Sequence, residues 1–190
     1  NIEWKIVKNL MLGSIPASFL MTYYLKGIDL YAYENVKIIN FSLGIALVLT
    51  SFAVILQPLI IKKSVALQSI SSKNTSILTL LLGLLLGVLV TLTSVGAGAM
   101  GITALLLLYP KMSIKKIIGT DIAHAVPLTL FAGLGHLNLG TVNVYLLVSL
   151  LIGSIPGIWL GSNLSSKIDE KWLRFILAIV LLIVGAQLIK

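Results

Sequence analysis

The chain has 190 residues, of which 58% are hydrophobic and only 11% are charged, and its mean hydropathy is +1.07. Because a soluble domain carries about 25% charged residues, this composition excludes a soluble protein and indicates an integral membrane protein. Cysteine is absent, and two histidines and six acidic residues leave little material for a metal centre, so we expect no metal and no cofactor.

Seven apolar segments follow one another along the chain and predict an all-α, polytopic helix bundle. Most of them are close to the roughly 20 residues that cross a bilayer. The fourth is too short to cross and ends at Pro110, which predicts a broken or re-entrant half-helix, and Pro127 should kink the fifth. The segments are 7–25, 37–61, 75–93, 97–109, 117–137, 142–163 and 172–189.

Lysine and arginine are distributed unequally between the two sides of this predicted bundle. Most of the 14 basic residues lie near the N-terminus or in the second, fourth and sixth connections, and such an excess marks the cytoplasmic side. The net charge of +8 is therefore a topology signal, and we expect no nucleic-acid partner. The cytoplasmic set is Lys5, Lys8, Lys62, Lys63, Lys73, Lys111, Lys115, Lys116, Lys167, Lys171 and Arg174, and the opposite set is Lys26, Lys37 and Lys190.

One short motif recurs at an offset of 140 residues, as Leu12–Ala17 (LGSIPA) and Ile152–Gly157 (IGSIPG). Each copy opens a span and is followed by a charged linker and a second span. The copies lie five segments apart and cross in opposite directions, which predicts an inverted-topology repeat, a construction typical of secondary transporters. Chance recurrence is the alternative. The kinks or close contacts predicted from these motifs and from the fifth segment lie at Gly13, Pro16, Pro127, Gly153 and Pro156.

The repeat also predicts how the chain is divided. Partners for the third, fourth and fifth segments would precede residue 1, so we expect half of the first repeat to lie outside this chain. The predicted units are the remainder of the first repeat with two helices (1–61), a cytoplasmic linker (62–76) and the second repeat (77–190), which contains a glycine break (93–101), a kinked helix (117–137) and a helix pair (142–189).

Between two apolar runs, the stretch Leu92–Gly101 carries closely spaced glycines beside hydroxyl residues. Non-helical backbone at membrane depth is tolerated only where it lines a cavity, and a helix that begins near Ala97 would point its free N–H groups into that break, which favours an anion. A tight turn or a small-residue packing face is the alternative. The predicted substrate-binding donors are the hydroxyls of Thr93, Ser94 and Thr120 and the backbone of Gly96, Ala97 and Gly98.

Asp121 is the acidic residue that lies inside a predicted span, where a carboxylate costs roughly 2.5–3.5 kcal/mol. His124 lies on the same helical face and titrates near physiological pH, so we assign both residues to proton coupling or gating. An interfacial aspartate paired with Lys115 or Lys116 is the alternative. His136 would lie about 22 Å from Asp121 along an unbroken helix, as an exit residue or an interfacial histidine without a role.

In these motifs the sequence resembles the sulfite exporter TauE/SafE family of membrane permeases. The resemblance implies two inverted repeats in a bacterial-type inner membrane and the transport of sulfite, sulfonates or related sulfur-containing anions. Residues 1–61 resemble only the tail of the family's first repeat. The similar stretches are Thr93–Ala99 followed by Leu105–Pro110, then Gly119–Ala125 running on to Ala132–Leu137, and Gly153–Gly157 with Gly161 and Ser162.

These patterns together predict a secondary transporter of a small inorganic or organic anion that works by alternating access in the lipid bilayer. Outward movement of an anion needs only an inside-negative potential, whereas uptake needs a proton or a cation. An anion channel is one alternative. An intramembrane serine hydrolase built on Ser94 and His124 is another, but no Gly-x-Ser-x-Gly elbow surrounds the serine, so we do not expect an enzyme. The sequence leaves a homodimer open.

Overall fold

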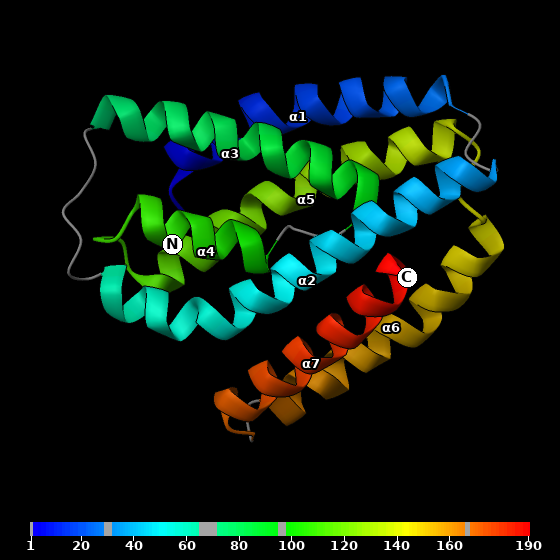
Figure 1. The fold of residues 1–190 in the computed structure, drawn as a ribbon. Helices are drawn as coiled ribbons and strands as arrows, with labels where there is room; N and C mark the ends of the chain where they lie inside the picture. Colours follow the sequence, from blue (N-terminus) through cyan, green and yellow to red (C-terminus); the bar gives the residue numbers. More distant parts are fainter. Residues whose placement is uncertain (1, 29–31, 65–71, 95–97, 166–167) are drawn as a thin grey trace.

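The computed structural model describes residues 2–28, 32–64, 72–94, 98–165 and 168–190, and within these ranges it contains helices and no strand (Figure 1). The prediction of an all-α protein is therefore confirmed. The helices are α1 (Trp4–Lys26), α2 (Tyr33–Ser64), α3 (Ser72–Thr93), α4 (Ala99–Leu108), α5 (Ile114–Asn138), α6 (Val144–Ser165) and α7 (Glu170–Ile189).

Five of the described helices, α2, α3, α5, α6 and α7, are long and apolar enough to cross a membrane. Helix α1, which we expected to be a span, has 23 residues but does not belong to this set. Helix α4 has 10 residues and is about 15 Å long, half of the roughly 30 Å of a bilayer core. It is the half-helix that the short fourth segment predicted.

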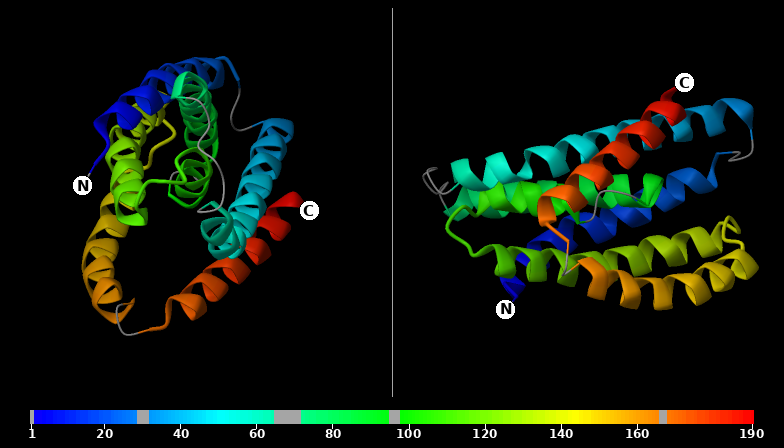
Figure 2. Two further views of the ribbon diagram at one scale, coloured as in Figure 1. Left: turned by 90° about the vertical axis from the view of Figure 1, so that its left-hand side faces the viewer. Right: turned by 90° about the horizontal axis from the view of Figure 1, so that it is seen from below.

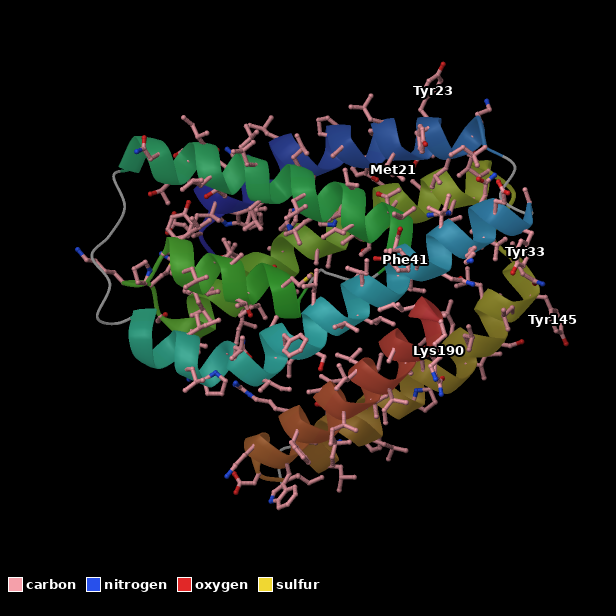
Figure 3. The ribbon with its side chains drawn as sticks, viewed as in Figure 1. Met21, Tyr23, Tyr33, Phe41, Tyr145 and Lys190 are labelled. Atoms are coloured by element: carbon pink, nitrogen blue, oxygen red, sulfur yellow. The ribbon has the colours of Figure 1, made fainter. Side chains whose placement is uncertain are left out.

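The ends of the helices gather on two sides of the bundle (Figure 1). The start of α1, the end of α2, the start of α3 and the α4–α5 connection lie together at the left of that view, and we call this the lysine-rich side. On the opposite side, Tyr23, Tyr33 and Tyr145 are 79%, 81% and 85% exposed and project outward from three different helices (Figure 3). Exposed tyrosines near the ends of membrane helices are typical of a membrane interface.

Helix α1 packs against α3 and α5, and small residues make its contact with α3. A Cβ built on Gly13 would overlap the carbonyl oxygen of Leu80, and one built on Gly83 would overlap that of Leu10. Glycine lets two membrane helices approach until their backbones touch, which replaces the hydrophobic driving force that is missing in lipid. The first Gly-Ser-Ile-Pro motif is therefore a close-packing motif in this structure.

A second close contact joins α2 to α7 (Figure 2). A Cβ on Gly44 would lie 2.7 Å from the carbonyl oxygen of Gly185, and one on Gly185 would lie 2.9 Å from that of Gly44. The Ser51 hydroxyl donates to the carbonyl of Ala178 at 2.8 Å, and these two residues lie seven positions after Gly44 and before Gly185. The helices are therefore antiparallel, and their two glycines meet at one crossing point.

The second Gly-Ser-Ile-Pro motif has a different environment from the first. All described side chains of α6 from Val144 to Leu164 are exposed, and no atom lies within 4 Å of a Cβ built on Gly153 or Gly157. Two nearly identical motifs thus occupy a packed and an uncovered position in the same chain.

This contrast gives a matched pair of substitutions. Gly13→Ala should destabilise the 190-residue chain because its methyl group would overlap Leu80, and overpacking costs about 1–3 kcal/mol. Gly153→Ala should be neutral or stabilising, because alanine is favoured over glycine in a helix by about 1 kcal/mol and the position is open. Thermal unfolding of both variants in detergent tests this, and equal shifts would contradict the described contact.

Candidate functional site

The glycine break lies between the end of α3 and the start of α4. Ser94, directly after α3, has a φ of 56°, and Gly98, directly before α4, has a φ of 93°. Such positive values are unusual for a residue with a side chain, and glycine adopts them without a steric cost. The predicted donors Gly96 and Ala97 lie outside the described residues.

Helix α4 begins inside the bundle rather than at its edge. Figure 1 shows its first turn near the middle of the bundle, well short of the end of α3. The first intrahelical bond runs from the Ile102 N–H to the Gly98 carbonyl at 2.8 Å, so the N–H groups that precede Ile102 have no partner within the helix. Because the N-terminus of a helix carries a partial positive charge, this position attracts a negative group.

The negative group that lies there is the carboxylate of Asp121, from α5. A Cβ on Gly101 would overlap Oδ1 of Asp121 and would lie 3.1 Å from its Cγ. The backbone of Gly98 also faces the carboxylate. Asp121 is only 1% exposed, yet neither of its oxygens makes a well-formed hydrogen bond to any described residue. The carboxylate therefore occupies the helix terminus that the sequence predicted as an anion site.

The described ion pairing argues against the interfacial alternative for Asp121. Lys116, one of the two lysines proposed as its partner, instead binds Oε2 of Glu3 at 2.5 Å. Thr120 completes this cluster, since its hydroxyl accepts the Glu3 N–H at 3.0 Å and donates to the Lys116 carbonyl at 2.7 Å. The start of α1 is thereby fixed to the first turns of α5.

His124 is fully buried on α5, and its Nε2 lies 2.9 Å from the hydroxyl oxygen of Ser14 on α1. Its Nδ1 has no hydrogen-bond partner among the described residues. No hydrogen bond joins His124 to Asp121 in the described structure, so the predicted pair is buried together but not directly bonded. Ser14 belongs to the first Gly-Ser-Ile-Pro motif, whose link to His124 the sequence analysis missed.

Two of the three hydroxyl groups predicted to bind the substrate donate to their own helices. Thr93 donates to the carbonyl of Leu89 at 2.7 Å, Thr120 donates to its own helix as described above, and Ser94 is exposed. Threonine in a helix commonly bonds to the carbonyl four residues earlier, which explains both cases. In the described structure Thr93 and Thr120 thus donate to their own helices, and the backbone N–H groups at the start of α4 remain as further candidate donors at the break.

His136 lies near the far end of α5, as expected, and joins that end to α3. Its Nε2 is 2.7 Å from the Thr91 carbonyl, and its Nδ1 is 3.2 Å from the Thr141 hydroxyl. Thr91 in turn donates its hydroxyl to that of Ser18 on α1 at 2.8 Å. These bonds connect three helices at the side opposite to Lys116.

A cavity of about 420 Å³ lies on the lysine-rich side, where the starts of α1 and α3 meet the end of α4. Its lining includes Glu3, Lys5, Asn9 and Lys111, together with Tyr109, whose hydroxyl lies 2.7 Å from that of Thr79. The charge of Glu3 is paired with Lys116, so the two lysines leave this lining with an excess of positive charge. Sequence reasoning had assigned these lysines only to topology.

The described residues contain no group of three or more His, Asp or Glu side chains that could hold a metal ion. Among the described residues, Asp121 and His124 are the buried titratable groups beside the break, and the first backbone amides of α4 are its candidate donors.

The sequence of this chain matches a known protein family. Residues 1–188 match the family model described as Sulfite exporter TauE/SafE. The chain is 36% identical over 190 residues to the probable membrane transporter protein YjnA of Bacillus subtilis (strain 168), covering 99% of this chain and 74% of that protein. It is 23% identical over 189 residues to the probable membrane transporter protein YdhB of the same organism, covering 100% of this chain and 74% of that protein.

No solved structure matches the chain. The family match over nearly the whole chain agrees with the resemblance carried by the glycine break and the Gly-Ser-Ile-Pro motif, and the apolar helices make this a multi-pass membrane protein. The chain is thus a membrane transporter protein that belongs to the sulfite exporter TauE/SafE family.

Proposed function

We propose that this membrane transporter carries a small sulfur-containing anion, such as sulfite or a sulfonate, by alternating access. The observation that carries the proposal is the half-length helix α4, whose N-terminus opens in the interior of the bundle beside the buried Asp121. Carriers with broken helices hold anionic groups at such half-helix N-termini near the membrane midplane. The family description favours a sulfur-containing anion.

An inverted repeat is part of this proposal, with the units 1–61, 62–76 and 77–190. The crossing of α2 and α7 supports it, because Gly44 and Gly185 contact each other and are 141 residues apart, against 140 for the two Gly-Ser-Ile-Pro motifs. A pseudo-two-fold axis between these glycines would relate α1–α2 to α6–α7. The uncovered face of α6 around Gly153 would then correspond to the face of α1 that α3 covers.

The polar groups are arranged in an order that suits an anion path. The cavity with Lys5 and Lys111 provides an entrance on the lysine-rich side, and the N-terminus of α4 provides a site at depth. Asp121 and His124 are the groups proposed for coupling, and His136 holds α5 to α3 at the far side. In this proposal the protein's own backbone, rather than a buried lysine, holds the cargo, which allows its release.

Flux measurements test the proposal. In proteoliposomes that contain the protein, we expect saturable exchange of sulfite, sulfate, thiosulfate or methanesulfonate, with a preference among them. Flux that never saturates would support a channel instead. Absence of flux for all four anions, under both an imposed potential and an imposed pH gradient, would refute the assignment of a sulfur-containing anion.

The glycine break offers a second test with a control in the same chain. Gly98 and Gly140 both have positive φ values, of 93° and 71°, and no atom lies within 4 Å of a Cβ at either position. Alanine at either site should therefore be strained by its backbone conformation rather than by a neighbouring atom, at a cost of about 1–3 kcal/mol. Gly98→Ala should nevertheless lose most anion flux, because it changes the turn that aims α4, whereas Gly140→Ala should keep it. Equal flux in the two variants would mean that the break is only a turn.

Ser14 and Ser154 form a further matched pair. Ser14→Ala would leave the buried Nε2 of His124 without its partner, which should cost about 1–3 kcal/mol of stability and reduce flux. The hydroxyl of Ser154 reaches only the carbonyl of Leu151, at 3.4 Å on an exposed face, so Ser154→Ala should change neither. Thermal unfolding and flux of both variants decide whether the Ser14–His124 contact matters.

A further inference from the structure

We infer that the carboxylate of Asp121 and the transported anion are alternative occupants of one position, the N-terminus of α4, so that an anion binds there only when Asp121 has taken up a proton. This inference rests on the proposed anion transport. It makes the transporter a proton–anion symporter with one proton for each anion.

The first argument is that the position is already filled. The Asp121 carboxylate lies on the first turn of α4, so close to Gly101 that a methyl group there would overlap it. Helix α4 has 10 residues and carries the positive end of its dipole at this turn. An incoming anion would be attracted to the same positive end of α4. Two negative charges in one desolvated site repel each other strongly. The two occupants therefore exclude each other.

The second argument is that nothing else described in the structure holds the carboxylate. Asp121 is 1% exposed, and no described residue makes a well-formed hydrogen bond to either oxygen. A buried carboxylate without a cation is costly, and a proton removes that cost together with the attraction to α4. Protonation thus releases the helix terminus for another anion.

The titratable groups on the helices around Asp121 do not replace that proton. Helix α4 carries no titratable residue, and Tyr109 directly after it is bonded to Thr79. Lys5 and Lys8 of α1 are exposed in its first turns, and the far end of α1 carries Tyr23, Tyr24 and Lys26. Lys73 lies in the first turn of α3, and Lys115 is exposed at the start of α5.

The remaining titratable groups near Asp121 interact with residues other than Asp121. Lys116 is paired with Glu3, and His136 bonds to Thr91 at the far end of α5. His124 is the one buried titratable neighbour, and it is bonded to Ser14 through Nε2 while Nδ1 has no described partner. Helix α2, which packs against α4, carries Tyr33, Glu34 and Lys37 in its first turns, where they are exposed. No described lysine or arginine side chain is therefore in place to neutralise Asp121.

The exchange is balanced in protons and charge. A proton from the aqueous phase adds to a carboxylate oxygen of Asp121, the neutral carboxyl group moves away from the first turn of α4, and the anion binds there. After the site opens to the other side, the anion leaves, the proton leaves, and the carboxylate returns. A monovalent anion therefore crosses with its proton and moves no net charge.

The experiment uses methanesulfonate, a monovalent anion whose charge does not change near neutral pH, in proteoliposomes that contain the whole protein. Wild-type protein should accumulate it about tenfold for each unit of inward pH gradient and should ignore an imposed membrane potential. Asp121→Asn, which mimics the protonated side chain, should still exchange methanesulfonate across the membrane. In this variant a pH gradient should drive no accumulation, and the potential should now drive net flux.

Two glycines supply a second, independent variant with its control. Gly101→Ala should push the carboxylate away from α4 and weaken the pH dependence of methanesulfonate exchange. Gly133→Ala on α5, where no atom lies within 4 Å of the new methyl group, should leave it unchanged. Retention of exchange by these variants also shows that they are folded.

The outcomes separate the two proposals. Exchange by wild-type protein that is independent of pH, or accumulation by Asp121→Asn that still follows the pH gradient, would overturn the symport inference and leave anion transport standing. If wild-type protein exchanges none of the anions named above, both proposals fall together.

Discussion

The burial of one carboxylate within a membrane protein is the constraint on which the site depends. A charge at that depth is stable only beside a compensating group, and the compensating group here is the first turn of a short helix. That requirement explains several separate features, because α4 must begin inside the bundle, Gly98 must turn the chain into it, and Gly101 must leave room for the carboxylate. None of these features would be needed if the fourth segment simply crossed the bilayer.

Helix α1 holds the residues of this site in register. Through Gly13 it touches α3 backbone to backbone, through Ser14 it binds His124, and through the residue before its start, Glu3, it binds Lys116. All three contacts join residues far apart in the sequence. The position of α5 relative to α4, and hence of Asp121 relative to the helix terminus, is therefore fixed from outside the break itself.

Most of the fold could be predicted from the sequence, because apolar length and Pro110 determine where helices can exist. The half-length of α4 followed from the same reasoning, whereas the burial of Asp121 was one of two alternatives that the sequence left open. The hydrogen-bond partner of His124 could not be predicted in this way. Ser14 and His124 are 110 residues apart in the sequence, and their contact depends on how α1 packs. The hydroxyl donors stay a prediction, and the sequence could not show whether Thr93 and Thr120 would bond to their own helices, as they do in the structure. The two Gly-Ser-Ile-Pro motifs show most directly that a local motif does not determine burial, because nearly identical residues are packed in one copy and exposed in the other.

The contact between Gly44 and Gly185 has a consequence for how freely α2 and α7 can turn against each other. Each glycine faces the carbonyl oxygen of the other helix, and the side chains of Ile189, Val48 and Leu47 also reach this crossing point. A change of crossing angle would therefore require these close-packed side chains to rearrange and would strain the Ser51–Ala178 hydrogen bond. We expect α2 and α7 to move as one unit rather than to pivot at their glycines.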